Sequence, residues 1–450
     1  MRNSILLIMI AALVGAGAVV YAGNMLLQPP RDLLVTAGFS HDLITPNADG
    51  DQDITVFSYE LAADALVSLS LENEAGDRYF FRDRQPRGAG QYSVQFSGVV
   101  EGYTLPGEVI AGTVLRRLIP DGVYTWQFTA VAQVDGPDDS RVDGESMSLT
   151  GTLTVRDADS PLPELVEFSV FPTVFSPNQD GIADRTQVNV ALTKDAELDV
   201  YLLNETGERE FMPLRDVGRE PGEAGRQMYD YEGGVDIGAD PPPDGLYTVV
   251  ARAQDAAGQV VERRAELTIV DGGKPRAEIA AQRTGPTVIF EAQPYDERFY
   301  TDASTTGDDV APPESLSIQP LTMQVGDMLV FRLRVINYGL APIRTSGPPP
   351  GTVYQQTQTD AALGWFEQSG VWRVGIQCET SSESYPWRWA IGPEEDLVTQ
   401  VAPDGEVFYY LPPGESADVW GAIRMTEVLT AQNPQYCWAG LIHEDVEISL

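Results

Sequence analysis

Hydrophobic and polar residues alternate with a period of two in short runs along most of the chain. Val67, Leu69 and Leu71 alternate with polar neighbours, and Tyr124 and Trp126 belong to a second run of the same kind. Such short alternating runs are typical of β-strands with one buried face. No long stretch with the 3.6-residue period of an amphipathic helix follows the first 30 residues, so the pattern predicts an all-β protein.

Two landmarks occur twice in the same order, which indicates a duplicated domain. The run ITPNADGDQD at 44–53 returns as FSPNQDGIAD at 175–184, and PDGVYT at 120–125 returns as PDGLYT at 243–248. Turn residues punctuate both copies, and short strands joined by turns predict a β-sandwich for each. The copies are expected to span 33–156 and 163–271.

The repeated motifs resemble the bacterial immunoglobulin-like domains related to that of the flagellar hook-capping protein. The resemblance rests on the Phe-Ser-Pro-Asn-x-Asp-Gly-x-x-Asp opening, on Pro-Asp-Gly-x-Tyr-Thr and on a later Asp-x-x-Gly. The first copy departs from it, with Ile44 and Thr45 where the second has Phe175 and Ser176. The resemblance implies tandem immunoglobulin-like β-sandwiches of a secreted or cell-surface protein. It implies no reaction, because one fold hosts many functions.

The last third of the chain returns to the all-β pattern after a segment rich in Pro, Gly, Asp and Thr. We expect 272–315 to be a linker with a candidate first strand at 287–290, and 316–450 to form a C-terminal β-sandwich. The runs VGD, VINYG and LPPGES, at 325–327, 335–339 and 411–416, are similar to bacterial adhesion-type sandwiches of cell-surface proteins.

The only two cysteines, Cys378 and Cys437, both fall in this C-terminal region. Each stands at the end of an alternating apolar run, so both are expected on the inward faces of strands. In an oxidising compartment such a pair predicts a disulfide. Two buried free thiols are the alternative.

An uncharged apolar run extends from Ile5 to Ala22, behind Arg2. It predicts a hydrophobic export helix over 1–30. Two interpretations stay open, because VYA at 20–22 fits a cleaved signal peptide, whereas the length of the run approaches that of a membrane-spanning signal anchor. Either one places the rest of the chain outside the cytoplasm, membrane-anchored or secreted.

The formal net charge is −38 at pH 7. Proteins that bind nucleic acid draw much of their affinity from Lys and Arg on phosphates, so this charge argues against such a partner. It also opposes docking on anionic lipid headgroups. A solvated acidic surface that keeps an exported protein soluble is the simplest explanation.

One turn carries side-chain oxygens at every second position: Asn47, Asp49, Asp51 and Asp53. Such a row can wrap a hard cation, so calcium is the one candidate cofactor. The spacing departs from that of the EF-hand loop, and an Asx-type turn ahead of a strand is the alternative. The second copy keeps only Asn178, Asp180 and Asp184 of the set.

Six of the seven Trp residues lie in the C-terminal region, and Tyr385, Trp387 and Trp389 are expected on one face of a strand. An exposed row of this kind would be a stacking platform for sugar rings or for a protein partner. A buried row would be part of the core.

No catalytic residues are predicted. The chain has two histidines, His41 and His443, the latter expected to be solvated among acids, and it has no nucleophile elbow, zinc helix or phosphate loop. The sequence therefore predicts a non-catalytic stalk that presents a C-terminal binding module to a protein or glycan of the cell envelope. A glycan- or polymer-binding accessory protein and a secreted hydrolase are the alternatives.

Overall fold

The computed structural model describes the chain over 32–135, 141–214, 220–281, 286–295, 310–313, 320–402, 405–428 and 430–449. In these ranges the chain forms strands and short 3-10 helices, namely η2 (Val235–Ile237), η3 (Asp360–Leu363), η4 (Glu394–Asp396) and η5 (Thr430–Gln432). The predicted all-β class is confirmed. The export segment predicted at 1–30 lies outside the described residues, and no helix within them has the length and apolar character needed to cross a membrane.

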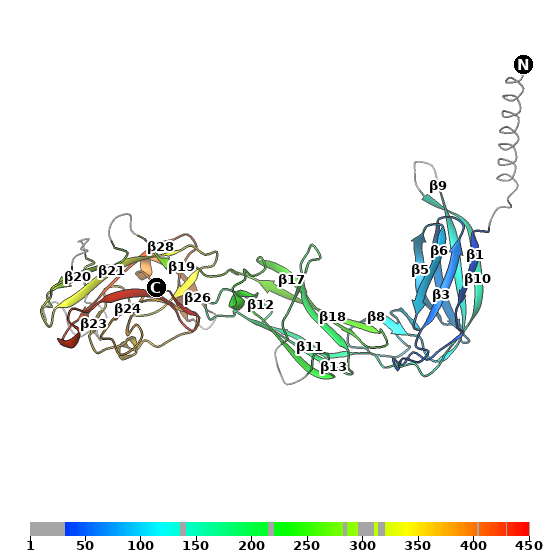
Figure 1. Cartoon of the computed structure of the whole chain (residues 1–450), viewed down its shortest axis with the longest axis horizontal. Helices are drawn as coiled ribbons and strands as arrows, with labels where there is room; N and C mark the ends of the chain where they lie inside the picture. The colour runs from blue at the N-terminus through cyan, green and yellow to red at the C-terminus, as the bar shows by residue number, and fades with distance from the viewer. Residues whose placement is uncertain are drawn as a thin grey trace, which may run out of the picture.

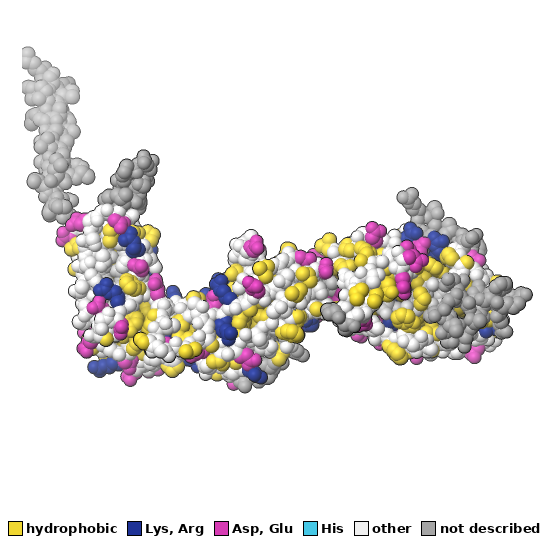
Figure 2. Space-filling view, turned by 180° about the vertical axis from the view of Figure 1, so that it is seen from behind, with side chains coloured by type: hydrophobic (Ala, Val, Ile, Leu, Met, Phe, Trp, Pro, Cys, Tyr) yellow, Lys and Arg dark blue, Asp and Glu magenta, His cyan; other side chains and the backbone are white. Residues whose placement is uncertain are grey.

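Six sheets form three modules in a row (Figure 1). The first module lies at one end, with its strands running across the long axis of the molecule. The third module, which holds the C-terminus, lies at the other end. Acidic side chains are scattered over all three modules on the face seen in Figure 2, as expected for a solvated acidic surface.

The first module packs two sheets against each other. Its strands are β1 (Leu34–Phe39), β2 (Leu43–Ile44), β3 (Thr55–Leu61), β4 (Ala65–Asn73), β5 (Arg78–Arg87), β6 (Gly90–Phe96), β9 (Gly122–Asp135) and β10 (Arg141–Val155). One sheet has the order β1-β3-β6 and the other β2-β10-β9-β4-β5. Side chains of both sheets, among them Phe57 and Phe128, share one core.

The alternation in the sequence decides which side chains enter this core. Val67, Leu69 and Leu71 of β4 are fully buried, while Ser68 between them is partly exposed. Burying one such apolar side chain contributes about 1.5–3 kcal/mol. The period-two pattern thus identifies the apolar face of β4, and this face packs against the partner sheet.

The second module repeats this strand order. Its strands are β11 (Leu165–Phe171), β12 (Val174–Phe175), β13 (Thr186–Leu192), β14 (Glu197–Leu203), β15 (Arg209–Phe211), β16 (Gly225–Tyr231), β17 (Gly245–Gln254) and β18 (Val260–Ile269). The order β11-β13-β16 matches β1-β3-β6, and β12-β18-β17-β14-β15 matches β2-β10-β9-β4-β5. In both modules the short second strand pairs in parallel with the last strand.

Two further strands from the first copy join the sheet of the second module. β7 (Val99–Glu101) and β8 (Thr113–Leu118) lie in the chain between β6 and β9. β8 nevertheless pairs antiparallel with β18, and β7 pairs with β8. We call residues 98–118 the clip. Two strands within 33–156, the range expected to form one repeat, therefore belong to the sheet of the second module.

The third module also packs two sheets. Its strands are β19 (Ala277–Ile279), β20 (Ile289–Gln293), β21 (Met328–Asn337), β22 (Ile343–Thr345), β23 (Val353–Gln355), β24 (Trp372–Cys378), β25 (Trp387–Ala390), β26 (Val398–Val401), β27 (Val407–Leu411), β28 (Ser416–Arg424), β29 (Cys437–His443) and β30 (Glu447–Ser449). One sheet has the order β19-β21-β28-β23, with β20 also on β21, and the other β26-β27-β22-β24-β29-β30, with β25 also on β24.

Part of the segment expected to be a linker, 272–315, belongs to the third module. β19 and β20 both pair with β21. The candidate strand at 287–290 overlaps β20, and β19 precedes it. β19 has only three residues and lies among turn residues, so the composition of the segment does not reveal it.

Candidate functional site

The aromatic row predicted as a binding platform is buried. Tyr385, Trp387 and Trp389 are 4%, 2% and 0% exposed. The ring of Trp389 lies 4.6 and 4.9 Å, between centroids, from those of Phe331 and Tyr354. The prediction of a stacking platform at these three residues is therefore wrong, because the face of β25 that carries both tryptophans forms the core.

Tyr385 does not share that face. Its ring lies over Gly375 and Gly440, which alternate with the core residues of β24 and β29. A Cβ atom at Gly440 would lie 2.5 Å from this ring. The two glycines leave room for Tyr385, which covers the outer side of the sheet.

The side chains predicted to hold calcium, Asn47, Asp49, Asp51 and Asp53, lie in one turn. Asp53 accepts three backbone N–H groups at 2.7–3.1 Å. Asn47 and Asp49 each accept the N–H group two residues further on. These bonds are those of the Asx-turn alternative. No three His, Cys, Asp or Glu side chains within the described residues are gathered to hold a metal ion, and calcium at this loop stays a prediction.

Replacement of Asp53 by Ala is expected to lower the unfolding free energy of the first module by about 1 kcal/mol, because backbone N–H groups lose their acceptor. Urea denaturation is expected to give the same loss with and without a calcium chelator. Asp51→Ala, at an exposed acid of the same turn, should change little. If Asp53→Ala lowers the unfolding free energy only in the absence of the chelator, the result would instead support the calcium site.

The corresponding loop of the second module docks on the third module. A Cβ atom on Gly181 would lie 2.1 Å from the carbonyl oxygen of Ser369, and one on Gly370 2.2 Å from the carbonyl carbon of Asp180. Both glycines have positive φ, 82° and 78°. Only glycine permits this backbone conformation together with so close an approach.

Polar contacts join the same surfaces. The Tyr410 hydroxyl donates to Asp180 Oδ2 at 3.0 Å, and His443 Nε2 lies 2.8 Å from the carbonyl oxygen of Gln179. The imidazole stacks on Trp372 and is 2% exposed. Burial lowers the pKa of His443 to about 4, so the ring is neutral at pH 7. The expectation of a solvated His443 is wrong, because the docked loop covers it.

A buried ionic cluster lies behind this junction. Arg373, 0% exposed, places Nη1 2.8 Å from Asp360 and 3.0 Å from Glu444. Its other nitrogens donate to the carbonyls of Ser346 and Phe366 at 2.6 and 2.7 Å. Burial raises the pKa of Glu444, while the neighbouring guanidinium groups favour its charged form. Glu444 is the neighbour of His443 in the chain. By holding Glu444, the ionic cluster therefore helps to fix the position of His443 at the docking surface.

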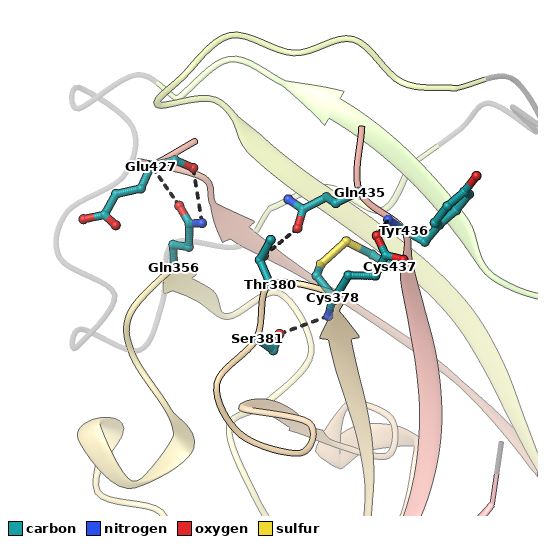
Figure 3. The surroundings of a disulfide bond; sticks show 9 residues. Gln356, Cys378, Thr380, Ser381, Glu427, Gln435, Tyr436 and Cys437 are labelled. Atoms are coloured by element: carbon teal, nitrogen blue, oxygen red, sulfur yellow. Dashed lines mark hydrogen bonds between the residues drawn. A yellow bond between two sulfur atoms is a disulfide. The ribbon is translucent and has the colours of Figure 1, made fainter. Parts of the chain in front are cut away.

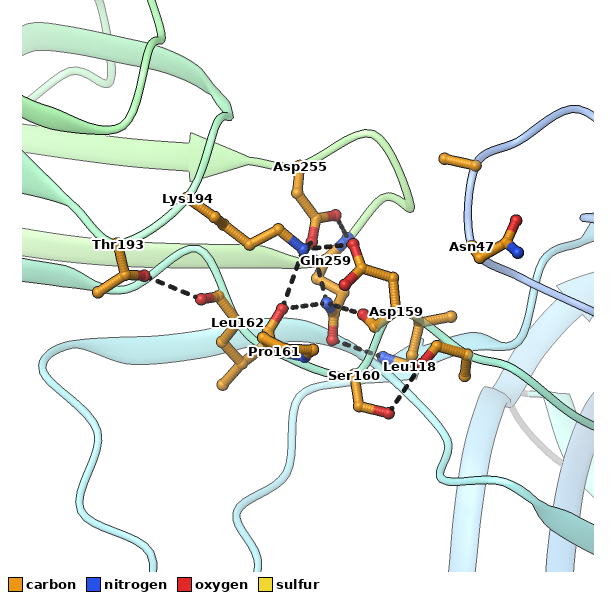
Figure 4. Close-up of polar contacts among 12 residues, drawn as sticks. Asn47, Leu118, Asp159, Ser160, Pro161, Leu162, Thr193, Lys194, Asp255 and Gln259 are labelled. Atoms are coloured by element: carbon orange, nitrogen blue, oxygen red, sulfur yellow. Dashed lines mark hydrogen bonds and ion pairs between the residues drawn. The ribbon is translucent and has the colours of Figure 1, made fainter.

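A second polar cluster joins the first and second modules (Figure 4). Gln259 is 0% exposed, donates to the carbonyl of Asp159 at 3.0 Å and accepts from the backbone N–H of Leu118, in β8, at 3.3 Å. Lys194 lies 2.6 Å from Asp159 and 2.9 Å from Asp255. The cluster thus ties β8 and the segment between the modules to the second module.

Both repeated landmarks hold the segment that leads to the next module. Asp121 accepts the N–H groups of residues 157 and 158, and Asp244 those of residues 271 and 272. The carbonyls of Pro46 and Pro177 accept the N–H groups of residues 159 and 273. The motifs recognised as a duplication are therefore the residues that fix how each module connects to its neighbour.

A cavity of about 420 Å³ lies in the third module where β22 ends. The pairing of β22 with β27 stops at Thr345 and Tyr409, while β27 begins at Val407. Side chains of Trp365, Phe408 and Tyr409 line the space beyond this point. The volume is that of a small-ligand pocket. No local pattern in the sequence indicates this cavity, because its lining comes from separate segments.

The predicted disulfide between Cys378 and Cys437 is confirmed. The two residues are directly opposite in the ladder of β24 and β29. Hydrogen bonds between Thr380 and Gln435, and from the Cys378 N–H to Ser381, surround the bridge (Figure 3). The disulfide therefore closes one end of the β24–β29 ladder.

No protein-family model matches the chain, and no curated protein matches it significantly. The resemblance of the repeats to the immunoglobulin-like domains rests on the motifs quoted above. The function is therefore inferred from the geometry of the modules and their junctions.

Proposed function

We propose that the chain is a non-catalytic, exported protein of the cell envelope or its surroundings. Its first two modules form a stiff spacer that presents the third module, the binding end. The observation that carries this proposal is the clip, because a module that contributes strands to its neighbour's sheet cannot swing freely. The pairs of β8 with β18 include Val114 opposite Val261.

The second junction supports the same role by a different device. The loop at 178–184 approaches the third module at backbone distance and makes buried hydrogen bonds to Tyr410 and His443. Breaking such contacts would leave buried polar groups unpaired, at about 1–3 kcal/mol each. Free rotation between these modules is therefore costly.

Features of the two repeats support an immunoglobulin-like fold for both. Each places three strands on one sheet and the remaining strands on the other, as in sandwiches of that type. The hydroxyls of Tyr124 and Tyr247, near the start of β9 and β17, donate to the carbonyls of Pro120 and Pro243 at 2.6 and 2.7 Å. Immunoglobulin-like domains have the same bond at their tyrosine corner.

Export is supported by the apolar segment at 1–30 and by the disulfide, since disulfides persist in oxidising compartments. Mass spectrometry of the mature protein would separate a cleaved leader from a retained anchor. A non-catalytic role is supported by the burial of His443, which is 2% exposed and lies against the carbonyl of Gln179 at a junction.

Replacement of Val114 by Pro tests the spacer. Proline removes the N–H group and clashes within a paired strand, so the β8–β18 ladder should open while the modules stay folded. We expect a single conformation to fit the small-angle X-ray scattering profile of the parent chain. The profile of the Val114→Pro variant should be fitted only by an ensemble of conformations.

The matched control is Val109→Pro in the same clip, at a side chain that is 93% exposed and outside the ladder. This variant should scatter like the parent chain. Equal scattering by the Val114→Pro variant and the parent would refute the clip as the source of stiffness.

A further inference from the structure

The cavity at the end of β22 has an unequal distribution of charge. Glu394 and Glu406 line it, and both are exposed. Glu394 opens η4, whose next two residues, Glu395 and Asp396, are exposed acids as well. The cavity therefore opens beside several carboxylates.

Arg344 is the one cation among the described residues that line the cavity, and its side chain is buried. Its side chain is 7% exposed, donates from Nη2 to the carbonyl of Ser369 at 2.7 Å and lies 5.5 Å from the ring centroid of Phe408. Its charge also acts on buried Asp180 of the docked loop. Arg344 thus binds at the junction and against the ring of Phe408, whereas the exposed charges among the described lining residues are acidic.

The aromatic rings and one carboxylate are arranged together. Glu394 and Tyr409 both line the cavity, and the carboxylate of Glu394 raises the pKa of the Tyr409 hydroxyl. Trp365, Phe408 and Tyr409 are each partly exposed on the cavity. Aromatic faces attract cations, and a carboxylate beside them adds charge attraction.

From these observations we infer that the cavity binds a guanidinium or ammonium group, supplied by an Arg or Lys side chain of a partner polypeptide. The net charge of −38 favours the approach of a basic partner. A nucleotide or another anion would meet the carboxylates of the opening. A neutral sugar could stack on the rings, but would gain nothing from the charge.

Calorimetric titration of the chain with N-acetyl-arginine amide tests this inference. The neutral isostere N-acetyl-citrulline amide and a disaccharide serve as comparison ligands. We expect saturable binding of the arginine compound that weakens as salt is added, with neither comparison ligand binding. Glu394→Gln is expected to weaken binding about tenfold, and Trp365→Ala by a similar factor.

Glu415→Gln, at an exposed acid of the same module outside the cavity lining, is the matched control and should bind like the parent. Binding of citrulline as tight as that of arginine, binding of the disaccharide alone, or no binding at all would overturn the inference. So would equal affinities of the Glu394→Gln and Glu415→Gln variants. The biological role of the cation site rests on the proposed spacer function. The two tests are nevertheless independent: a chain that does not bind the arginine compound can still show the scattering change on Val114→Pro, and a chain without that change can still bind the compound.

Discussion

Replacement of Arg373 by Met is expected to lower the unfolding free energy of the third module by about 3–5 kcal/mol, the cost of breaking a buried ion pair from one side. The guanidinium is fully buried between Asp360 and Glu444. Its loss leaves Asp360 without its cation, Glu444 with Arg388 alone, and two backbone carbonyls without this donor. Urea denaturation followed by Trp fluorescence reports on this module, since six of the seven Trp residues lie in it.

Arg334→Met is the matched control for that variant. Arg334 lies 2.7 Å from Asp418, but its side chain is about half exposed, so the loss should be at most about 1 kcal/mol. Equal losses from the two variants would show that the buried cluster does not stabilise the third module.

Removal of the disulfide by Cys378→Ala together with Cys437→Ala is expected to lower the unfolding free energy of the third module by about 4 kcal/mol. The bridged residues are 59 positions apart, and closing a loop of that length restricts the unfolded chain. Denaturation of the double variant against the oxidised parent measures the loss.

Reductant supplies an independent control for the disulfide. It should destabilise the third module of the parent and leave the double variant unchanged, because the chain has no other cysteine. Since Trp126 is the only Trp outside the third module, its fluorescence follows the first module, which should not respond. An unchanged unfolding midpoint of the third module would contradict the account of the bridge.

The strands of the first module and the disulfide could be predicted because their signals are local. Val67, Leu69 and Leu71 mark their face of β4 by alternation alone. Cys378 and Cys437 stand at corresponding ends of two alternating runs, which the structure pairs directly.

The clip could not be predicted, because β8 pairs with a strand far along the chain. Val114 and Val261 carry no sign in the sequence of being partners. Alternation also shows that Trp387 and Trp389 share a face without showing which face is inside. Trp389 is buried against Phe331 and Tyr354, which other strands supply.

The two copies of the Asn-x-Asp-Gly loop show how context changes one motif. Asp49 of the first loop is exposed, whereas its counterpart Asp180 is buried, because Tyr410 and Gly370 of the third module cover it. The sequence predicted the turn in both places. Its use as a docking surface depends on the neighbouring module.

If the three modules form one stiff unit, the first and third modules stay at one distance from each other, and the distribution of this distance can be measured. Glu74→Cys and Glu415→Cys place spin labels at exposed turns of the first and third modules, and the native cysteines are held in their disulfide. Pulsed electron spin resonance is predicted to give one narrow distance peak for the parent chain and a broad one after Val114→Pro. A broad distribution in the parent chain would contradict the claim.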